Sequence, residues 1–599
     1  MFKISIFKHE DDADKLRSQY HGKDSLPIKV SIKVALRMLK LYWTDKDSIP
    51  SWILLSIIVI LTSGAIYLAK VFNTWYKDFW DTVQKYDLPG FKYQLMMFAI
   101  LATIHVIVSV YNAYLRSKLA INWRQWLTKK VMHDYLGDNT YYKMQLEDRK
   151  TENPDQRISE DLSSFVSLSI SLILGTLSDL AMLGTFAVVL WDLSYAVDMT
   201  LWNGYVLHLP DGYMLYLAIA YALVGTILTF IIGKPLVRLN FRQQRYEADF
   251  RFSLIRVREN SESISLYQGE QSEEQILKLK FTDVVKNYVR LIKREKVLGF
   301  FTLGYAQTAV IFPMLIAAPM YFAKVITIGS IMQISSAFGK VQDSLSTVIQ
   351  SFSSWASYKA VVDRLALFFD SMDASTQIEC LKSKDTVKDF ALEHLEVKDP
   401  KQDILWQDLS INLTKGQSLL VRGPSGCGKS TLIKTIAGIW PHATGDIQIP
   451  SKDKVLFLSQ RPYLPQGSLF DAACYPGEKQ DESKVAKLFE ELRLDYLLKD
   501  LHREDNWSSM LSLGEQQRIA IIRALLLKPD LLIMDEASSA LDEAIETTAY
   551  NLIKQELSNS IILSVGHRSS LIKMHDLILL SKGSGKWQLE DSKKEFVEG

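Results

Sequence analysis

Five long runs with almost no charged side chains constrain the fold of this chain more than any other feature. Residues 48–69, 93–115, 212–233 and 297–323 lack Asp, Glu, Lys and Arg, and residues 162–191 contain a single charge. A membrane-spanning helix needs about 20 predominantly apolar residues, so each run is long enough to cross a bilayer. A buried helix of a soluble protein is the alternative for any one run. Five such runs separated by charged loops predict a membrane domain.

The loops between these runs alternate in positive charge. Residues 1–47, 116–161 and 234–296 hold ten, nine and fourteen Lys or Arg residues, whereas 73–92 holds three and 193–211 none. Because positively charged loops stay on the cytoplasmic side, the N-terminal segment, the two long loops and the C-terminal region are predicted to be cytoplasmic. That arrangement requires an even number of spans. The long loops are rich in helix formers, so we expect them to be helical extensions of the spans.

A sixth, weaker span at 325–358 completes the even number, although it contains Lys340 and Asp343. Residues 30–43 place apolar side chains on one face and cations on the other, which indicates a helix at the membrane interface; an ordinary surface helix is the alternative. The predicted organisation is a cytoplasmic N-terminal segment at 1–47, a transmembrane domain at 48–370, a linker at 371–388 and a further domain at 389–599.

The average composition hides two unlike parts. The chain has a formal net charge of +1 and 48% hydrophobic residues, but residues 1–370 carry +7 and residues 371–599 carry −6. The small total argues against a strongly basic nucleic-acid-binding protein, so no nucleic acid partner is predicted. Three cysteines, Cys380, Cys427 and Cys474, are too few for a disulfide framework.

Residues 423–431, GPSGCGKST, match the P-loop pattern between an apolar strand at 419–422 and a helical stretch. Glycines let the backbone N–H groups point at phosphate oxygens, and the helix N-terminus adds positive potential. Lys429 is expected to reach the β- and γ-phosphates, and Ser430 to ligate Mg²⁺. The predicted ATP-binding residues here are Gly423, Pro424, Ser425, Gly426, Cys427, Gly428, Lys429, Ser430 and Thr431.

A second element of a phosphate site follows downstream in the sequence DLLIMDE at 530–536. Its four apolar residues predict a buried parallel strand. Asp535 at the strand end is predicted to hold Mg²⁺, directly or through water, and Glu536 to orient or deprotonate the attacking water. An Asp-Glu pair alone means little, but after an apolar strand downstream of a P-loop it indicates an ATPase.

The segment LSLGEQQR at 511–518 resembles the LSGGQ signature of ATP-binding cassette (ABC) proteins. The resemblance implies that signature residues bind the γ-phosphate of the nucleotide on an opposite cassette. One cassette and six predicted spans then imply a half-transporter, with a homodimer predicted and a heterodimer left open. The residues implied to bind nucleotide are Ser512, Gly514, Glu515 and, in the D-loop SALD, Asp542; Gln460 matches the Q-loop glutamine near Mg²⁺, and His567 the switch histidine at the γ-phosphate.

Two loop phrases, NPDQRI at 153–158 and residues 247–270, resemble ABC subfamily D, the peroxisomal acyl-CoA and cobalamin transporters, and the bacterial SbmA/BacA-like proteins with a fused ATPase. In that family such loops carry coupling helices that contact the cassettes. At the first phrase, Asn can cap a helix, Pro suits its first position and Gln can close a capping box. The predicted coupling residues are Asn153, Pro154, Asp155, Gln156, Ser263 and Leu266.

The sequence departs from the general cassette pattern in two places. The signature has Leu513 and Glu515 where the consensus has Gly and Gln, a variant also found in the bacterial relatives. The adenine-stacking aromatic residue is not evident in LEVKDPKQD at 395–403, which is flanked by Phe390 and Trp406. Nucleotide preference is therefore less defined by the sequence than phosphate binding.

Polar groups within membrane spans are candidates for a transport path. They are Asp179, Lys340, Asp343 and His105. Lys340 and Asp343 would share a helix face, so an internal ion pair is the alternative for them. A structural hydrogen bond is the alternative for Asp179, and a structural role for His105.

The predicted fold is multi-domain: an all-α six-helix transmembrane domain of the type IV ABC exporter class, followed by an α/β P-loop nucleotide-binding domain. The SbmA/BacA resemblance implies a homodimeric, ATP-driven transporter for a hydrophilic solute, such as a peptide or cobalamin, in a bacterial inner membrane. Import is mildly preferred, because that family includes importers. One alternative is a subfamily D exporter of acyl-CoA or lipid. Another is a proton-coupled permease with a regulatory cassette, in which Asp179 carries the proton.

Overall fold

The computed structural model describes residues 26–147, 153–195, 197–200, 206–322, 324–385, 389–451, 454–478 and 480–592. The chain divides into two compact units. The helical unit comprises Met1–Asp134 and Lys150–Asp370, and the α/β unit comprises Tyr135–Arg149 and Ser371–Gly599. The α/β unit therefore includes a piece of the first predicted cytoplasmic loop.

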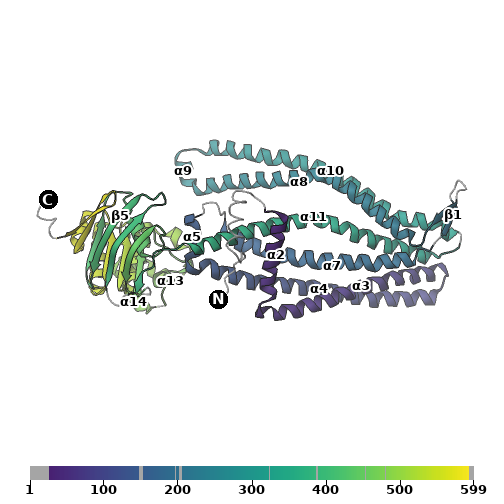
Figure 1. Cartoon of the computed structure of the whole chain (residues 1–599), viewed down its shortest axis with the longest axis horizontal. Coiled ribbons are helices and arrows are strands. Elements are labelled where there is room, and N and C mark those ends of the chain that lie inside the picture. Colours follow the sequence, from purple (N-terminus) through teal and green to yellow (C-terminus); the bar gives the residue numbers. More distant parts are fainter. Residues whose placement is uncertain are drawn as a thin grey trace. The chain divides into compact units, whose positions relative to one another are not determined.

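Long helices form the helical unit (Figure 1). They begin with the shorter α2 (Ile28–Trp43) and continue with α3 (Ile49–Gln84), α4 (Leu88–Leu136), α7 (Leu162–Asp192), α8 (Tyr213–Glu259), α10 (Glu270–Phe322) and α11 (Ile328–Gln377). At 1.5 Å rise per residue, all of these helices except α2 exceed the thickness of the bilayer core, as predicted for spans with cytoplasmic extensions. The short elements between them are α6 (Pro154–Gln156), α9 (Ser261–Leu266), β1 (Val197–Thr200) and β2 (Val206–Leu209). Helix α5 (Thr140–Glu147) follows α4 in the sequence but belongs to the α/β unit.

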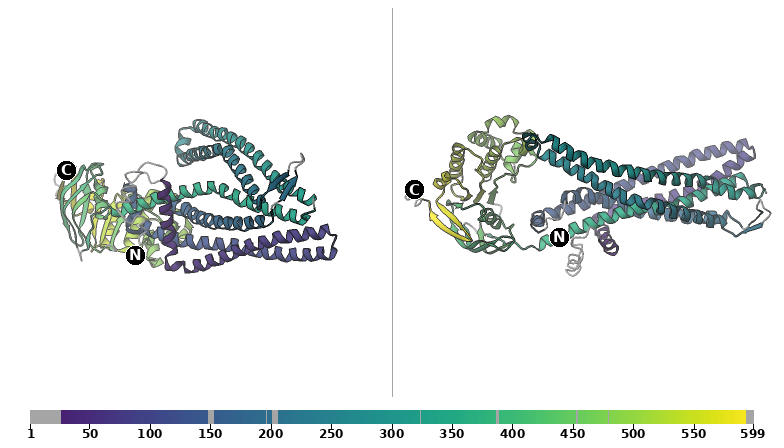
Figure 2. Two further views of the ribbon diagram at one scale, coloured as in Figure 1. Left: turned by 45° about the vertical axis from the view of Figure 1, so that its right-hand side comes forward. Right: turned by 90° about the horizontal axis from the view of Figure 1, so that it is seen from above.

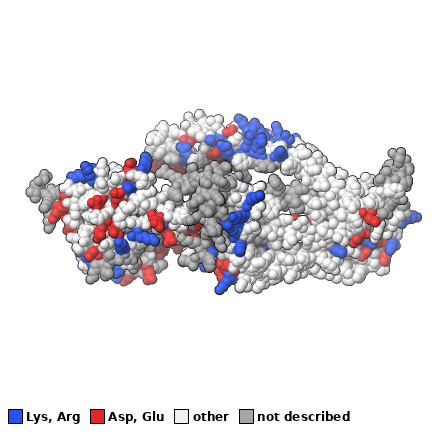
Figure 3. Space-filling model, in the orientation of Figure 1, with Lys and Arg blue, Asp and Glu red and all other residues white. Residues whose placement is uncertain are grey.

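Five helical stretches of the described residues are long and apolar enough to cross a membrane. They are Lys46–Gln84, Leu88–Leu146, Pro154–Asp192, Tyr213–Glu259 and Glu270–Phe322. The sixth predicted span lies in α11, which is helical but is not among these five because its charged and polar residues lower its hydropathy. A sixth crossing therefore stays a prediction. Figure 3 shows a broad surface free of Lys, Arg, Asp and Glu over the helical unit, with charged side chains gathered on either side of it.

Helices α8 and α10 pack side by side as an antiparallel pair joined by α9 (Figures 1 and 2). Tyr221 and Tyr305 stack with ring centroids 4.4 Å apart, and each hydroxyl donates to the other residue's carbonyl oxygen, at 2.7 and 2.8 Å. A Cβ at Gly225 would lie 2.2 Å from the Tyr305 ring, so the close approach of the two helices requires glycine there. Further along the pair, the buried Asn287 donates to Leu239 O at 3.0 Å.

Two buried carboxylates fasten α11 within the helical unit. Asp161, which is 4% exposed, accepts hydrogen bonds from Arg364 of α11 at 2.6 and 2.9 Å and from Arg157 at 2.8 Å. Asp363, which directly precedes Arg364 on α11, accepts from the Ser31 hydroxyl of α2 at 2.5 Å. Because a buried carboxylate needs such partners, these contacts fix both α2 and the start of α7 against α11.

The α/β unit is built on two sheets. The six-stranded sheet has the order β14-β13-β6-β12-β11-β8, with β14 antiparallel and the others parallel. Its strands are β6 (Ser418–Arg422), β8 (Val455–Leu458), β11 (Leu531–Asp535), β12 (Ile561–Val565), β13 (Leu577–Gly583) and β14 (Lys586–Asp591). The four-stranded sheet, in the order β3-β7-β4-β5, contains β3 (Lys384–Asp385), β4 (Phe390–Lys398), β5 (Ile404–Leu413) and β7 (Ala443–Ile449).

The central strands are apolar throughout because both of their faces are covered. Leu532 and Met534 of β11 belong to one hydrophobic cluster, and the alternate residues Leu531 and Ile533 belong to another. The helices of the unit are α12 (Lys429–Ile436), α13 (Leu469–Cys474), α14 (Glu482–Glu491), α15 (Trp507–Met510), α16 (Leu513–Leu527) and α17 (Glu543–Glu556). Loops that leave the carboxyl ends of the neighbouring strands β6, β12 and β11 carry the predicted phosphate-site residues, as is usual for open parallel sheets. All three cysteines are free thiols.

Candidate nucleotide-binding and hydrolysis site

The P-loop connects β6 to α12 and curls around its own lysine. Gly426 and Gly428 have φ values of 83° and 94°, where glycine is not strained. Lys429 is buried and donates from Nζ to Gly423 O and Pro424 O, both at 3.0 Å. The loop thus joins a strand to a helix N-terminus, which suits a phosphate group. Of the other P-loop residues, Ser425 and Ser430 are exposed, Thr431 is half-buried and Cys427 is buried.

Neither aromatic residue that flanks the expected adenine loop is free to stack on a base. Phe390 and Trp406 are both 0% exposed and lie in the same hydrophobic cluster. Trp406 instead donates from Nε1 to Gly428 O at 3.0 Å, so it supports the P-loop from beneath. A Cβ at Gly428 would lie 3.1 Å from that indole nitrogen, so glycine is needed at this position for steric reasons as well as for its positive φ.

Asp535 at the end of β11 meets the P-loop helix. Burial raises the pKa of Asp535 and the charge of Glu536 adds to this, while a hydrogen bond from Ser430 and the charge of Lys429 act in the opposite direction. The hydroxyl and the carboxylate are oxygen ligands of the kind that Mg²⁺ prefers, and a cation there would offset the cost of the half-buried negative charge. The two residues therefore fit the predicted Mg²⁺ site.

Glu536 lies between Gln460 and His567. Gln460 Nε2 donates to Glu536 Oε2 at 3.0 Å, and His567 Nε2 lies 3.3 Å from Glu536 Oε1. Glu536 also has a left-handed backbone, with φ 51°, held by the hydrogen bond from its N–H to Val565 O at 3.1 Å. Such non-glycine positions are costly and cluster at functional sites. Three residues predicted from separate motifs thus form one cluster around a carboxylate.

Gln517 is a buried contact residue of the site that sequence reasoning missed. It is 0% exposed, and its amide nitrogen donates to Gln460 O at 2.9 Å and lies 3.4 Å from Glu536 O. Its amide oxygen accepts from the Ala540 N–H at 2.9 Å. One side chain of α16 therefore connects the loops of Gln460, Glu536 and Ala540. Its position within the signature segment at 511–518 was a signal for it in the sequence.

Ser512 and Glu515 of the signature segment form a capping box at the start of α16. The Glu515 carboxylate accepts from the Ser512 N–H and hydroxyl, both at 2.7 Å, and from the Tyr496 hydroxyl. Burial raises the pKa of Glu515, but these hydrogen bonds and the charge of Arg518 outweigh it, so the net shift is downward. Gly514 allows close packing, because a Cβ there would lie 2.9 Å from Ala540 O.

Within one chain, the signature and D-loop residues predicted to bind nucleotide form no hydrogen bonds to the P-loop or to Glu536 among the described residues. In the described part of the chain, no hydrogen bond connects Ser512, Gly514 or Glu515 to the P-loop. Asp542 caps α17 by accepting from the Ile545 N–H at 2.8 Å. The structure therefore gives Ser512, Glu515 and Asp542 helix-capping contacts, and their predicted role toward a nucleotide on another copy stays a prediction.

The predicted coupling residues are exposed or half-buried, and one local expectation about them is wrong. Asn153 does not cap α6 through its side chain; it has a left-handed φ of 57°, and its carbonyl oxygen accepts from the Gln156 N–H. No capping box forms, because the Gln156 side chain donates to Glu160 at 3.0 Å instead. Pro154 and Asp155 begin α6, and Ser263 and Leu266 lie exposed on α9.

A different part of the first loop packs with the α/β fold. Helix α5 belongs to the α/β unit, and its Leu146 packs against the hydrophobic cluster that contains β4 and β6 residues. Met144 of the same helix is buried. Sequence reasoning placed the coupling site of this loop further along, at NPDQ. The apolar residues within an otherwise polar stretch were the signal for α5.

The structure does not bring the transport-path candidates together. Lys340 and Asp343 are exposed on α11 and form no ion pair with each other, and Asp179 of α7 is half-buried without a hydrogen-bond partner among the described residues. His105 of α4 is exposed, with Nε2 3.5 Å from the Ser109 hydroxyl and its ring near Phe72.

Comparisons with known proteins identify both parts of the chain. A family profile described as ABC transporter transmembrane region 2 matches residues 38–322, and one described as ABC transporter matches 406–539. An uncharacterised ABC transporter ATP-binding protein of Haemophilus influenzae is 34% identical over 92% of each chain. The chloroplastic ABC transporter D family member 2 of Arabidopsis thaliana is 32% identical, over 92% of this chain and 87% of its own. The human lysosomal cobalamin transporter ABCD4 is 27% identical, over 91% and 95%.

These matches confirm the resemblance drawn from the sequence motifs, and they confirm the predicted combination of a helical transmembrane region with an α/β nucleotide-binding domain. They also confirm that the chain binds ATP and is an ATPase. The chain belongs to the ABC transporters, as a multi-pass membrane half-transporter of subfamily D type with a fused ATPase domain.

Proposed function

We propose that two copies of this chain form an ATP-driven importer in which Glu536 activates the water that attacks ATP. One observation carries the catalytic part: the Glu536 carboxylate is held between Gln460 at 3.0 Å and His567 at 3.3 Å, directly after Asp535. A carboxylate placed this way can accept a proton from water, while its neighbours fix its orientation. The experiment for this role is the Glu536→Gln variant, described below.

The other site residues divide the remaining work. Backbone N–H groups of the P-loop and Lys429 bind the β- and γ-phosphates, and His567 contacts the γ-phosphate from the other side. Ser430, Asp535 and the amide oxygen of Gln460 would hold Mg²⁺, which neutralises charge that develops on the phosphates. The amide nitrogen of Gln460 is already engaged by Glu536, so its oxygen is the atom left for this purpose.

Completion of the site by a second copy is supported by the signature segment. Ser512 is exposed at the start of α16, and within the described chain it makes no hydrogen bond to the P-loop. Its N-terminal helix position would favour an anionic phosphate from another molecule. A homodimer would supply two such composite sites and twelve spans.

The cargo we propose is a hydrophilic solute such as a peptide or a cobalamin, imported across a bacterial inner membrane. The SbmA/BacA-like loop phrases support the hydrophilic class and the location, and a relative named as a cobalamin transporter supports the second cargo. The cation-rich loops support a cytoplasmic position for the N-terminus and the ATPase domain. Lipid or acyl-CoA export is the competing reading, because the chain is of subfamily D type.

Uptake assays in proteoliposomes test the proposal. Purified protein would be reconstituted with the ATPase domain outward, and labelled cobalamin, peptide and acyl-CoA would be supplied inside or outside with Mg²⁺ and ATP. ATP-dependent movement of cobalamin or peptide toward the ATPase side, absent in Glu536→Gln, supports the importer. If only acyl-CoA moves, the proposed cargo is wrong. If the cargo still moves in the Glu536→Gln variant, ATP hydrolysis does not drive transport.

A further inference from the structure

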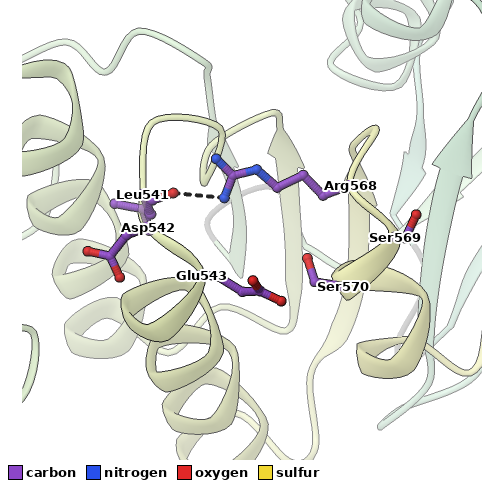
Figure 4. A pocket seen from close by; sticks show the side chains of 6 residues that line it. All are labelled: Leu541, Asp542, Glu543, Arg568, Ser569 and Ser570. Carbon is purple, nitrogen blue, oxygen red and sulfur yellow. Dashed lines mark hydrogen bonds between the residues drawn. The ribbon is translucent and has the colours of Figure 1, made fainter.

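Two loops of the α/β unit face each other across a pocket of about 440 Å³. Leu541, Asp542 and Glu543 line it from the D-loop and the start of α17, and Arg568, Ser569 and Ser570 line it from the loop after His567 (Figure 4). The first loop follows Glu536 in the sequence and the second follows His567. The pocket therefore lies between the chain segments that follow Glu536 and His567.

Arg568 spans the pocket between these loops. Its Nη1 donates to Leu541 O at 2.7 Å, the bond drawn in Figure 4, and its Nη2 donates to Ser539 O at 2.8 Å. Both acceptors are backbone carbonyl oxygens of the D-loop. A planar guanidinium presents two donors in a fixed geometry, so this contact fixes the distance between the loops as well as their orientation.

Glu546 of α17 holds the same two loops from the inside. Its side chain is 1% exposed, and its two carboxylate oxygens accept from the Ser538 hydroxyl at 2.7 Å and the Ser570 hydroxyl at 3.0 Å. Arg568 Nη1 lies 3.4 Å from the second oxygen. A buried carboxylate is costly without such partners, so the two loops and the arginine form one connected network.

The His567 side chain has few contacts of its own. Its imidazole is about half exposed, and among the described residues it has a single polar contact, with Glu536 at 3.3 Å. The side chain is therefore not fixed by its own packing. Its backbone is held on both sides: Arg422 Nη2 lies 3.4 Å from His567 O and the Gly566 N–H donates to Val421 O, while Arg568 and Ser570 follow on the C-terminal side.

We propose that Arg568 and Glu546 are positioning residues for ATP hydrolysis, which clamp the loop of His567 to the loop that follows Glu536. The clamp keeps the imidazole on the side of the γ-phosphate when Glu536 takes the proton from water. This inference rests on the roles of Glu536 and His567 in the proposed function. Neither Arg568 nor Glu546 touches the phosphates in this scheme, and both act through His567.

Kinetics of the full-length protein in lipid nanodiscs test the clamp. Arg568→Gln is expected to lower kcat for Mg·ATP at least about tenfold with KM changed less than about twofold, because a displacement of about 1 Å in a catalytic group is that costly. Arg568→Lys keeps the charge but cannot reach both carbonyl oxygens, so its kcat should be intermediate. Arg493→Gln, at an exposed arginine of the same unit, is the matched control and should leave kcat unchanged.

The decisive comparison combines Arg568→Gln with His567→Ala. If Arg568 acts through His567, the double variant should hydrolyse ATP no more slowly than His567→Ala alone. Losses that multiply in the double variant, or a normal kcat in Arg568→Gln, would overturn the clamp while leaving the proposed function intact. Unchanged hydrolysis in His567→Ala would overturn the role of His567 in the proposed function, and the clamp with it.

Glu546 needs a milder partner variant, because its removal from a buried position can unfold the domain. Ser570→Ala removes one of its hydrogen bonds and should lower kcat about threefold, again without an additional loss in a His567→Ala background. Binding of a fluorescent ATP analogue, measured in parallel, should stay within about twofold of wild type for all folded variants. Weakened nucleotide binding with unchanged kcat would contradict a positioning role.

Discussion

The two units of this transporter arrange their polar side chains in opposite ways. In the α/β unit, Gln460, Glu536 and His567 come from three separate loops and meet at one carboxylate. In the helical unit, Asp179 and Lys340 lie on different helices, and neither has a hydrogen bond or ion pair with another candidate of the transport path in the described residues. The α/β unit thus assembles its cluster within one chain, whereas the helical unit does not.

The difference follows from how each fold treats backbone and side chains. A parallel sheet brings the carboxyl ends of its strands to one edge, so loops that are distant in sequence converge automatically. Long helices spread their residues over many turns, and a polar side chain on one helix meets a partner only where packing selects that pair. The α/β fold therefore brings polar side chains from several loops to one site. In the helical unit, a polar cluster depends on which helix faces pack together, within one chain or with a second copy.

The largest expected effect is on the cluster itself. Glu536→Gln removes the proton acceptor but keeps an amide that Gln460 and His567 can still contact. ATP hydrolysis should fall at least about 100-fold, the usual contribution of a general base, while ATP binding persists. Phosphate release from the reconstituted protein measures it, with Glu556→Gln, in an exposed pair with Lys528, as control. Hydrolysis within about threefold of wild type would show that Glu536 is not the residue that activates the attacking water.

The helical unit contains a buried polar centre of its own, the Asp161 carboxylate with its two arginines. Removing its charge should lower the stability of the protein by a free energy comparable to the effect at Glu536. Asp161→Asn removes the carboxylate charge that both Arg364 and Arg157 contact. Loss of one partner of a buried pair costs about 3–5 kcal/mol, but Arg364 is partly exposed and solvated, so we expect about 2–3 kcal/mol. The thermal midpoint in detergent measures it. An equal shift for the neighbouring exposed Glu160→Gln would show that this centre is no more important than the surface.

A third prediction concerns the pH dependence of the stability of the α/β unit. Burial lowers the pKa of His575 in the α/β unit to about 4, with Nδ1 donating to Leu571 O and Nε2 facing the Ser564 hydroxyl. The pKa of His575 in the folded protein lies below its value of about 6.5 in the unfolded chain. The neutral, buried His575 therefore contributes its full stability above pH 6.5, and this contribution is lost as the pH falls toward 4. The loss at pH 5 is about 2 kcal/mol.

Thermal unfolding at pH 7.5 and pH 5 checks this expectation. His575→Gln should show a smaller difference between the two pH values than wild type does, because the titrating group is gone. His502→Gln, at an exposed histidine paired with Glu482, should retain the wild-type difference. Identical pH profiles for wild type and His575→Gln would contradict the assignment.

The smallest effect is expected at Asp179. Under an ATP-driven mechanism this single half-buried carboxyl is not an obligatory proton carrier, so Asp179→Asn should change ATP-dependent uptake less than about twofold. Movement of labelled solute from the proteoliposome interior toward the ATPase side, with and without an imposed proton gradient, measures it. Abolished uptake, together with a gradient dependence in the wild type, would favour the permease reading and would show that the helical unit contains active chemistry of its own.

Much of the α/β site was predictable because each motif is local. The P-loop, Glu536, Gln460 and His567 sit in short patterns whose spacing reflects one strand and one loop. The missed residues are those whose importance comes from long-range packing. Gln517 and Arg568 contact loops far away in the sequence, and Trp406 is a support for Gly428 rather than an adenine platform. Nothing in their immediate neighbours distinguishes such residues from ordinary helix or core positions.

In the helical unit, five of the six predicted spans were visible as runs of apolar residues, but the contacts between helices were not. The pairing of Asp161 with Arg364 joins positions 203 residues apart. The capping expectation at Asn153 also failed, since the Gln156 side chain donates to Glu160 one turn ahead. Hydropathy records which segments avoid water, and it carries no information on which helix faces meet.

By itself, the sequence determined that this chain crosses a membrane and hydrolyses ATP. Long uncharged runs can only be accommodated in lipid or a core, and the phosphate-binding motifs demand particular residues at fixed spacing. Only the tertiary structure decided which side chains support the reacting ones: Gln517 among the loops, Arg568 and Glu546 behind His567, and α5 as part of the α/β unit. Such contacts depend on segments that meet only after folding, because buried polar groups take whatever partner the packing brings within reach.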